Sequence, residues 1–277
     1  MEAPEETPVC PRHPDRVSYV RCQRCHRPAC ADCQRPAAVG FQCVDCVAEA
    51  QRDARPEVTA MGGRASGPVP YLTYGIIAIC VVVQLAVMGA PRLWGDLALA
   101  PIVAGEQPYR IITSAFTHAG LMHLGFNMFA LYMVGPYLEM LLGRLRYAAL
   151  YLSCAIGGTI AYLMVQPTDS LTPVVGASGA VFGLFGAVII LNRHLGRDSS
   201  GMLATVAINA VIGFVIPNIA WQAHFGGLAV GALLALAFAQ SRQQRRPLIA
   251  WGAIAVILGV CVGLWWLRYG STALGIG

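Results

Sequence analysis

Seven long apolar stretches, separated by short polar ones, dominate the chain from residue 71 onward. A helix of about 20 residues spans the roughly 30 Å hydrocarbon core of a bilayer, and each stretch is close to that length. The fifth and sixth stretches are nearly fused, and we separate them at "IPNIAWQ", where Pro217 and Asn218 interrupt a helix. The pattern therefore predicts seven membrane helices, at residues 71–89, 121–142, 147–166, 175–192, 202–220, 222–240 and 248–267.

The first 50 residues follow another pattern, because they are polar and rich in cysteine. They predict a compact module at residues 1–50. Residues 51–69 lack apolar periodicity and are rich in Gly, Pro and Arg, which predicts a flexible linker. The membrane domain then covers residues 70–268, and a short tail follows at 269–277. No charged start followed by an apolar segment is present in the module, so we expect no secretory signal and a cytoplasmic N-terminus.

Composition and charge support a multi-pass membrane protein. The chain of 277 residues is 56% hydrophobic and 12% charged, with a mean hydropathy of +0.58, which is too apolar for a soluble globule of this size. Its net charge is +5, and all nineteen of its Lys and Arg residues are arginine. They cluster in "GRLRY", "NRHLGRD" and "SRQQRRP", after the second, fourth and sixth stretches, as expected of cytoplasmic loops. We therefore expect an integral protein of a bacterial plasma membrane and no nucleic-acid partner.

Polar side chains inside membrane helices are costly and indicate function. Ser178 lies near the start of the fourth stretch, and His224 lies near the start of the sixth. His118, His123 and Asn127 open the second. In the expected orientation all three stretches begin on the outer side. The glycines around Ser178, taken alone, favour simple close packing of helices. The convergence on one leaflet instead predicts a catalytic site.

The spacing suggests how such a site would work. His123 and Asn127 are four residues apart and share one helix face, where paired donors suit a developing negative charge. Ser178 follows a predicted helix break, which would put its N–H at a helix N-terminus. The third to sixth stretches contain no Asp or Glu, so we expect a Ser178–His224 dyad and no triad. Glu139 is interpreted as structural, paired with an arginine such as Arg144.

At these residues the sequence resembles the rhomboid family of intramembrane serine proteases. The resemblance covers roughly residues 70–245 and rests on "GASG" around Ser178, "AHFGG" around His224 and "HAGLMHLGFN", which has the family's H-x4-H-x3-N form. "GPYLE" matches the family's G-x3-E. The resemblance implies an all-α polytopic fold with a six-helix core, to which the seventh stretch adds the extra C-terminal helix found in some members.

The resemblance also implies roles for single residues. Ser178 would be the nucleophile and His224 the general base and acid. His123 and Asn127, with the Ser178 N–H, would be oxyanion donors, and His118 would be structural or bind water. The family pattern further contains two motif glycines, a Tyr that stacks on the catalytic His in many relatives, and a Trp-Arg pair in the long outer loop. In this chain the corresponding residues are Gly176, Gly179, Phe182, Tyr109 and Arg110.

The sequence thus predicts a serine endopeptidase that cleaves transmembrane protein substrates in the lipid bilayer near its outer face. A helix shields its own carbonyls, so substrates should contain Gly, Ser or Ala there. The alternative is a catalytically inactive relative that binds membrane clients and uses the N-terminal module as an adaptor. Loss of Ser178 or His224 would mark such a protein, and both are present. A transporter would need acidic or broken helices at mid-membrane, which the stretches do not clearly show.

The N-terminal module contains four pairs of metal-ligand residues, each pair separated by two residues. Eight ligands suit two tetrahedral zinc sites, which would be structural because protein fills every position. The alternation resembles a B-box or RING-like cross-brace, in which the first pair shares a metal with the third; sequential pairing is the alternative. We expect the module to bind an unknown protein partner or regulate the enzyme, and we expect no cofactor for catalysis. The eight residues are Cys10, His13, Cys22, Cys25, Cys30, Cys33, Cys43 and Cys46.

Overall fold

The computed structural model describes residues 7–53, 58–65, 67–217 and 219–274. The contacts within the chain divide it into two units, Met1–Pro56 and Glu57–Gly277. The predicted helix interruption at Asn218 and parts of the predicted linker and tail lie outside the described residues.

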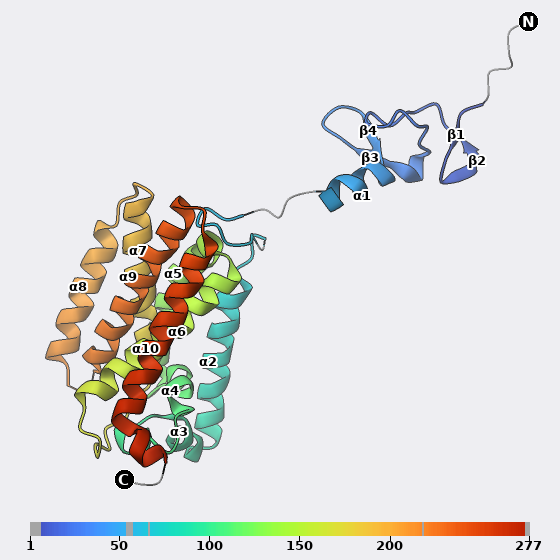
Figure 1. The fold of residues 1–277 in the computed structure, drawn as a ribbon. Helices are drawn as coiled ribbons and strands as arrows, with labels where there is room; N and C mark the ends of the chain where they lie inside the picture. Colours follow the sequence, from blue (N-terminus) through green and yellow to red (C-terminus); the bar gives the residue numbers. More distant parts are fainter. Residues whose placement is uncertain (1–6, 54–57, 66, 218, 275–277) are drawn as a thin grey trace, which may run out of the picture. The chain divides into compact units, whose positions relative to one another are not determined.

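The described residues of the smaller unit form two short hairpins, a 3-10 helix and an α-helix (Figure 1). Strands β1 (Val9–Cys10) and β2 (His13–Val17) pair antiparallel, as do β3 (Gln34–Pro36) and β4 (Phe41–Cys43). The 3-10 helix η1 (Ala31–Cys33) precedes β3, and helix α1 (Val44–Asp53) follows β4. Among the described residues, the buried core is Ala29 and six cysteines. A unit with so little apolar core needs metal ions or disulfides for stability.

The larger unit has a long helix at each of the seven predicted stretches (Figure 1). The helices are α2 (Tyr71–Gly89), α5 (Leu121–Leu142), α6 (Arg144–Val165), α7 (Ser178–His194), α8 (Ser200–Val215), α9 (Trp221–Gln243) and α10 (Pro247–Ala273). Four of them, α2, α6, α9 and α10, are long and apolar enough to cross a membrane, and α7 and α8 are shorter apolar helices. The predicted fold class, an all-α membrane domain with a small N-terminal module, is confirmed.

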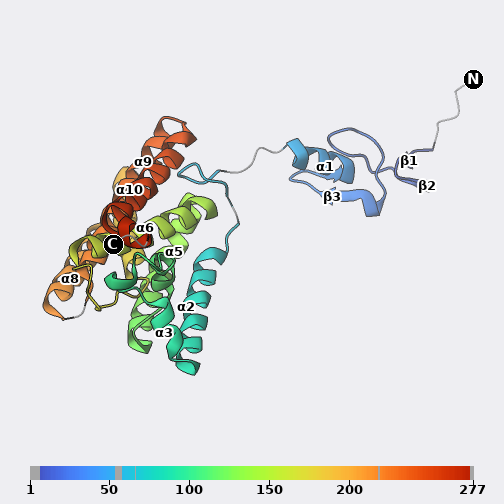
Figure 2. The ribbon, with the colours of Figure 1, turned by 60° about the horizontal axis from the view of Figure 1, so that its bottom comes forward.

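Helices α6, α7 and α9 pack against one another at the centre, and α8 packs against α7 and α9 (Figures 1 and 2). Glycines allow the close approach of α7 and α9. A Cβ on Gly227 would lie 1.9 Å from the Gly179 carbonyl oxygen, and one on Gly231 would lie 1.9 Å from that of Gly183. Only glycine fits at such contacts, which is how small residues bring membrane helices together.

The loop between α2 and α5 folds into four short helices at the end of the bundle where α7 begins; we call this end the Ser178 end. Its segment at Leu99 forms an isolated β-bridge with Val174, just before α7. This bridge joins the loop to the chain that leads to the serine. The short helices are α3 (Arg92–Leu97), η2 (Pro101–Val103), α4 (Arg110–Thr113) and η3 (Ser114–Phe116).

Part of the predicted linker is ordered. Residues 58–65 form a turn against the opposite end of the bundle, with Met61 fully buried in the main core. The Met61 N–H donates to the Leu141 carbonyl at 3.2 Å, and Arg146 donates to the Met61 carbonyl. The sequence interpretation missed this turn because a single Met in a Gly- and Arg-rich segment has no periodicity that predicts burial.

Candidate active site and metal centres

The structure brings Ser178 and His224 together. Ser178 is the first residue of α7 and His224 lies in the first turn of α9, so both lie at the Ser178 end of the bundle. The distance from Ser178 Oγ to His224 Nε2 is 2.9 Å, a normal hydrogen-bond length. The Phe182 ring, one turn further along α7, stacks on the His224 ring with centroids 4.2 Å apart and planes 9° apart. This contact fixes the orientation of the imidazole.

The segment before Ser178 is held by several backbone bonds. Gly176 has φ of +112°, a conformation that side chains other than glycine rarely adopt, and its N–H donates to the Ser114 carbonyl at 2.9 Å. The Ala177 N–H lies 3.4 Å from Nε2 of His118, which is fully buried. His118 thus contacts the residue next to the serine. The sequence predicted that this helix begins at residue 175, but α7 begins at Ser178, because the Gly176 conformation is not helical.

His123 lies directly beside the same segment. A Cβ on Gly176 would lie 2.6 Å from His123 Cε1, so the glycine allows the imidazole to approach. The Ala119 N–H lies 3.4 Å from His123 Nδ1, which assigns the proton to Nε2 and makes Nε2 a donor. Asn127 is buried one turn later, and its Nδ2 donates one hydrogen to the His123 carbonyl at 2.9 Å. Its second Nδ2 hydrogen remains for another acceptor.

The two residues Tyr109 and Arg110 organise the α2–α5 loop. The buried Arg110 guanidinium donates to the carbonyls of Gly95 and Ala98, the latter at 2.8 Å. Tyr109 is half exposed, and its hydroxyl lies 3.3 Å from the Asp96 carbonyl. None of these bonds involves Ser178 or His224. Gly179, the other motif glycine, lies against the Ala223 carbonyl at the α7–α9 contact.

Glu139 lies at the other end of the bundle, far from this arrangement along α5. It pairs with Arg144 at 3.6 Å, as predicted, but its main partners are at the N-terminus of α2. Its carboxylate accepts the Leu72 N–H at 3.0 Å and the N–H and hydroxyl of Thr73, each at 2.8 Å. The carboxylate thereby satisfies free N–H groups at the positive end of a helix dipole. No sequence spacing links residues so far apart.

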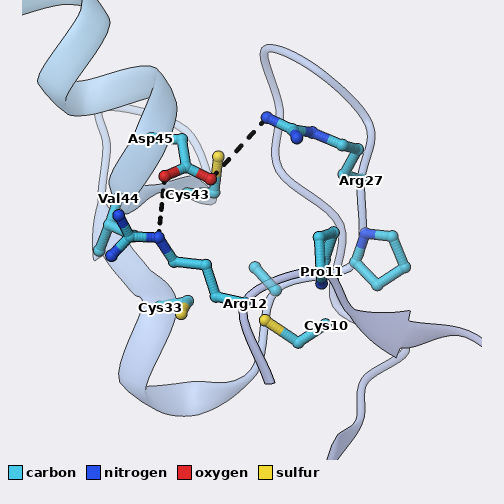
Figure 3. Close-up of a pocket in the computed structure, with 10 residues that line it drawn as sticks. Cys10, Pro11, Arg12, Arg27, Cys33, Cys43, Val44 and Asp45 are labelled. Atoms are coloured by element: carbon cyan, nitrogen blue, oxygen red, sulfur yellow. Dashed lines mark ion pairs between the residues drawn. The ribbon is translucent and has the colours of Figure 1, made fainter. Parts of the chain in front are cut away.

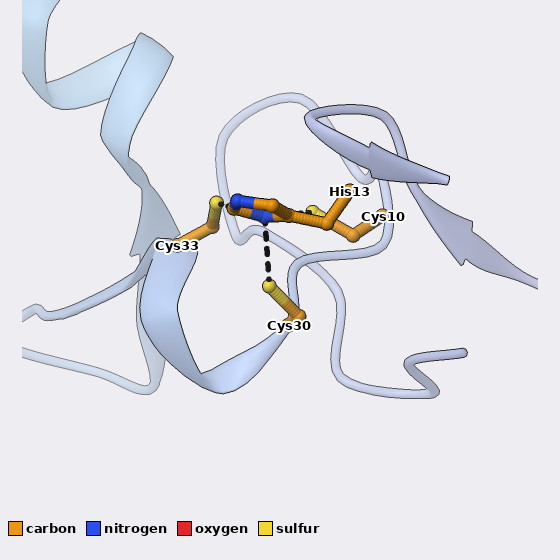
Figure 4. Close-up of side chains that lie close together, drawn as sticks. All are labelled: Cys10, His13, Cys30 and Cys33. Carbon is orange, nitrogen blue, oxygen red and sulfur yellow. Dashed lines mark hydrogen bonds between the residues drawn. The ribbon is translucent and has the colours of Figure 1, made fainter. Parts of the chain in front are cut away.

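In the small unit, the eight predicted ligands form two clusters, and within each the ligand atoms lie within 4.8 Å of one another. The structure decides the pairing as a cross-brace. One cluster contains Cys10, His13, Cys30 and Cys33 (Figure 4), and the other contains Cys22, Cys25, Cys43 and Cys46.

The spacing of these atoms fits a tetrahedral metal ion. His13 Nδ1 lies 3.3 Å from the sulfurs of Cys30 and Cys33, and Cys25 Sγ lies 3.8 Å from Cys43 Sγ. Ligand bonds of about 2.0–2.3 Å in a tetrahedron give separations of roughly 3.3–3.8 Å between ligand atoms. Both clusters can therefore bind a metal ion.

The thiols differ in how readily they ionise. Hydrogen bonding from the Cys30 backbone lowers the pKa of Cys10 to about 6, whereas burial, with neighbouring thiols, raises the pKa of Cys33 to about 11 and that of Cys46 to about 12. Crowded thiolates repel one another, and a bound dication removes that repulsion. The clusters thus have the chemistry of metal sites.

Ion pairs on the surface join the segments that contribute ligands. Asp45, at the start of α1, pairs with Arg12 at 2.9 Å and with Arg27 at 3.9 Å (Figure 3). All three side chains are partly exposed, so these pairs contribute little free energy compared with metal coordination.

The fold and the site define the class of protein as a multi-pass helical membrane protein with a Ser–His pair at one end of its bundle. Comparison with known proteins points to the same class. The family model described as "Rhomboid domain" matches residues 105–241. The chain is 37% identical over 148 residues to "Putative rhomboid protease YdcA" of Bacillus subtilis, covering 52% of this chain and 73% of that protein.

Two further relatives match about half of the chain. "Rhomboid protease GluP" of Bacillus subtilis is 35% identical over 141 residues, which are 49% of this chain and 27% of that protein. Human "Rhomboid-related protein 3" is 30% identical over 161 residues, 50% of this chain and 38% of that protein. The chain belongs to the rhomboid family, and the resemblance seen in the sequence is confirmed.

Proposed function

We propose that the protein is an intramembrane serine protease that cleaves transmembrane segments of other proteins. The observation that carries the proposal is the 2.9 Å contact between Ser178 Oγ and His224 Nε2, made by residues 46 positions apart on two helices. A serine hydroxyl is a weak nucleophile until an adjacent base accepts its proton, and this geometry supplies the base.

The reaction would be an acyl transfer in two steps. Ser178 attacks the substrate carbonyl while His224 takes its proton, and His224 then gives that proton to the leaving amine. Water, activated by the same histidine, hydrolyses the acyl-enzyme and restores Ser178. Phe182 keeps the imidazole plane aligned through both steps because it covers one face of the ring.

The oxyanion formed on the carbonyl would be stabilised by donors from α5 and α7. The candidates are His123 Nε2–H, the second Nδ2 hydrogen of Asn127 and the Ser178 N–H at the start of α7. His118 would act as a structural residue through the Ala177 N–H. Donors held in place before the reaction are worth on the order of 3 kcal/mol each in serine proteases.

We further propose that the bundle sits in a bacterial plasma membrane with the Ser178 end outside and the N-terminus in the cytoplasm. The arginine-rich loops after α5, α7 and α9 lie at the opposite end of the bundle and support this orientation. The substrates would be membrane proteins whose transmembrane helices contain Gly, Ser or Ala near the outer face, since such helices unwind most easily.

In the smaller unit we propose two structural zinc ions. One cluster offers three cysteines and a histidine and the other offers four cysteines, and closed tetrahedral sets of these donors suit zinc. Bound zinc would supply much of the folding free energy of the unit, whose core is small. The module would bind a cytoplasmic protein partner or regulate cleavage.

The test is cleavage of type I membrane reporters in proteoliposomes by the wild type, Ser178→Ala and His224→Ala. His194→Ala is the matched control, because His194 is exposed at the far end of α7. We expect cleavage by the wild type and the control and none by the two site variants. A folded wild type that binds the reporters but leaves them intact would contradict the proposal and favour the client-binding alternative.

A further inference from the structure

The C-terminal half of α10 contacts the segment of chain that leads to Ser178 and the loop segment that pairs with it. One segment is the 98–104 part of the α2–α5 loop, and the other is the 166–177 connection between α6 and α7. The two are joined by the reciprocal Leu99–Val174 backbone bonds, at 2.8 and 3.4 Å, and by the Ile102 N–H to the Ser170 carbonyl at 3.2 Å. Four residues after Val174 the chain reaches Ser178.

Trp265 on α10 holds the first of these segments. Its indole Nε1–H donates to the Ala104 carbonyl at 2.9 Å, and Ala104 itself is fully buried in a cluster with Leu99 and Val174. The indole therefore satisfies a carbonyl at the end of the segment that pairs with the chain before Ser178.

Arg268, one turn later, holds the second segment. Its guanidinium donates to the Met164 carbonyl at 2.6 Å and to the Gln166 carbonyl at 2.5 Å, where α6 ends and the connection begins. An arginine at a helix C-terminus satisfies carbonyls that lack a partner in the helix and opposes the negative end of its dipole. Tyr269 is buried beside it in the same cluster as Tyr162.

These contacts differ from ordinary anchoring at a membrane surface. The neighbours Trp266 and Leu267 are 51% and 85% exposed and face away from the bundle, as expected of lipid-facing residues. Trp265 and Arg268 are partly buried and direct their donors to backbone carbonyls inside the protein.

We propose that Trp265 and Arg268 are positioning residues of the protease. Through them α10 holds the segment before Ser178 so that the serine stays within hydrogen-bond distance of His224. This inference rests on the proposed function. Loss of either contact frees one of the two paired segments, and the displacement passes through the Leu99–Val174 bridge to Ser178. Coupling through such a packed network changes rates by roughly 2- to 30-fold.

The experiment compares the full chain in proteoliposomes with Trp265→Phe and Arg268→Gln. Trp265→Phe keeps an aromatic ring and removes the N–H, and Arg268→Lys is included because it restores a donor. Trp266→Phe is the matched control on the same turn. For each variant we would measure kcat and KM for a reporter, and amide hydrogen exchange in residues 98–104 and 166–177.

We expect Trp265→Phe and Arg268→Gln to lower kcat about tenfold with KM unchanged and to speed amide exchange in both segments. Arg268→Lys should recover part of the lost kcat, and Trp266→Phe should match the wild type. Unchanged kcat and unchanged exchange in both variants would overturn the inference, as would faster exchange without any loss of kcat. If the folded wild type cleaves no reporter, the proposed function fails. Faster exchange confined to the two segments in the variants would then still support the inference that Trp265 and Arg268 hold these segments, and unchanged exchange would overturn it.

Discussion

The close contact between α7 and α9 predicts that Gly227→Ala inactivates the protein. Gly227 lies one turn after His224 on α9, and a Cβ there would lie 1.9 Å from the Gly179 carbonyl oxygen and 2.7 Å from its carbon. Both atoms are backbone, so no side chain can rotate to make room. Ordinary contact begins at 3.4 Å, and the helices would therefore have to separate by about 1.5 Å at this level.

That separation falls directly on the Ser178–His224 pair. Gly179 adjoins Ser178, so moving the helices apart by that amount would lengthen the 2.9 Å contact between Oγ and Nε2 to about 4.4 Å, beyond hydrogen-bond reach. A displacement of about 1 Å can cost roughly 100-fold in rate, and we expect kcat/KM to fall by at least that factor. The extra methyl group should also lower the free energy of unfolding by about 1–3 kcal/mol.

The assay is reporter cleavage in proteoliposomes, combined with fluorophosphonate labelling of the serine and thermal unfolding. Gly259→Ala on α10 is the matched control, because a Cβ at Gly259 meets no atom within 4 Å. Alanine favours a helix over glycine, so the control should be neutral or slightly stabilising. If folded Gly227→Ala retained kcat/KM within threefold of the wild type, the argument that close α7–α9 packing aligns the pair would be refuted.

Three further predictions concern separate parts of the chain. Phe182→Ala should lower kcat about three- to tenfold by removing the ring that stacks on His224, whereas Phe182→Tyr should keep the wild-type rate; a rate for Phe182→Ala equal to the wild type would exclude a positioning role. Glu139→Ala should lower the free energy of unfolding by about 3 kcal/mol, measured in mixed micelles, because two N–H groups at the start of α2 lose their acceptor; an unchanged value would show that water replaces the carboxylate. Chelation of metal from the full-length chain should abolish the amide-exchange protection of residues 7–53 while the helices keep theirs, and added zinc should restore it; protection that survives complete metal removal would contradict a metal-dependent fold.

The local patterns of the sequence were enough to predict the helices and the candidate ligands. Hydrophobic runs long enough for a bilayer have few alternatives, because backbone groups in hydrocarbon must bond within a helix. The predicted stretch 71–89 matches α2 residue for residue. The C-x2-C and C-x2-H pairs likewise predicted metal ligands, because the two-residue spacing lets neighbouring ligands reach one ion.

Sequence reasoning also placed Ser178, His224, His123 and Asn127 at one end of the bundle. Consecutive membrane helices run in opposite directions, so the second, fourth and sixth stretches begin at the same end of the bundle. This alternation alone brings the four residues to one end. Whether side chains from different helices touch depends on rotation and separation of the helices, which periodicity does not set. The hydrogen bond between Ser178 and His224 therefore appears only in the tertiary structure.

What the sequence by itself determined was the set of elements and the residues with reactive side chains, because helix length, polarity and ligand spacing are local properties. The tertiary structure alone decided three things: the cross-braced ligand pairing, the burial of Met61 in the core of the bundle, and the bonds from Trp265 and Arg268 to carbonyls more than 100 positions earlier. Each joins side chains to distant backbone or to ligands of another pair. Such contacts depend on how whole elements pack, so no short sequence pattern predicts them.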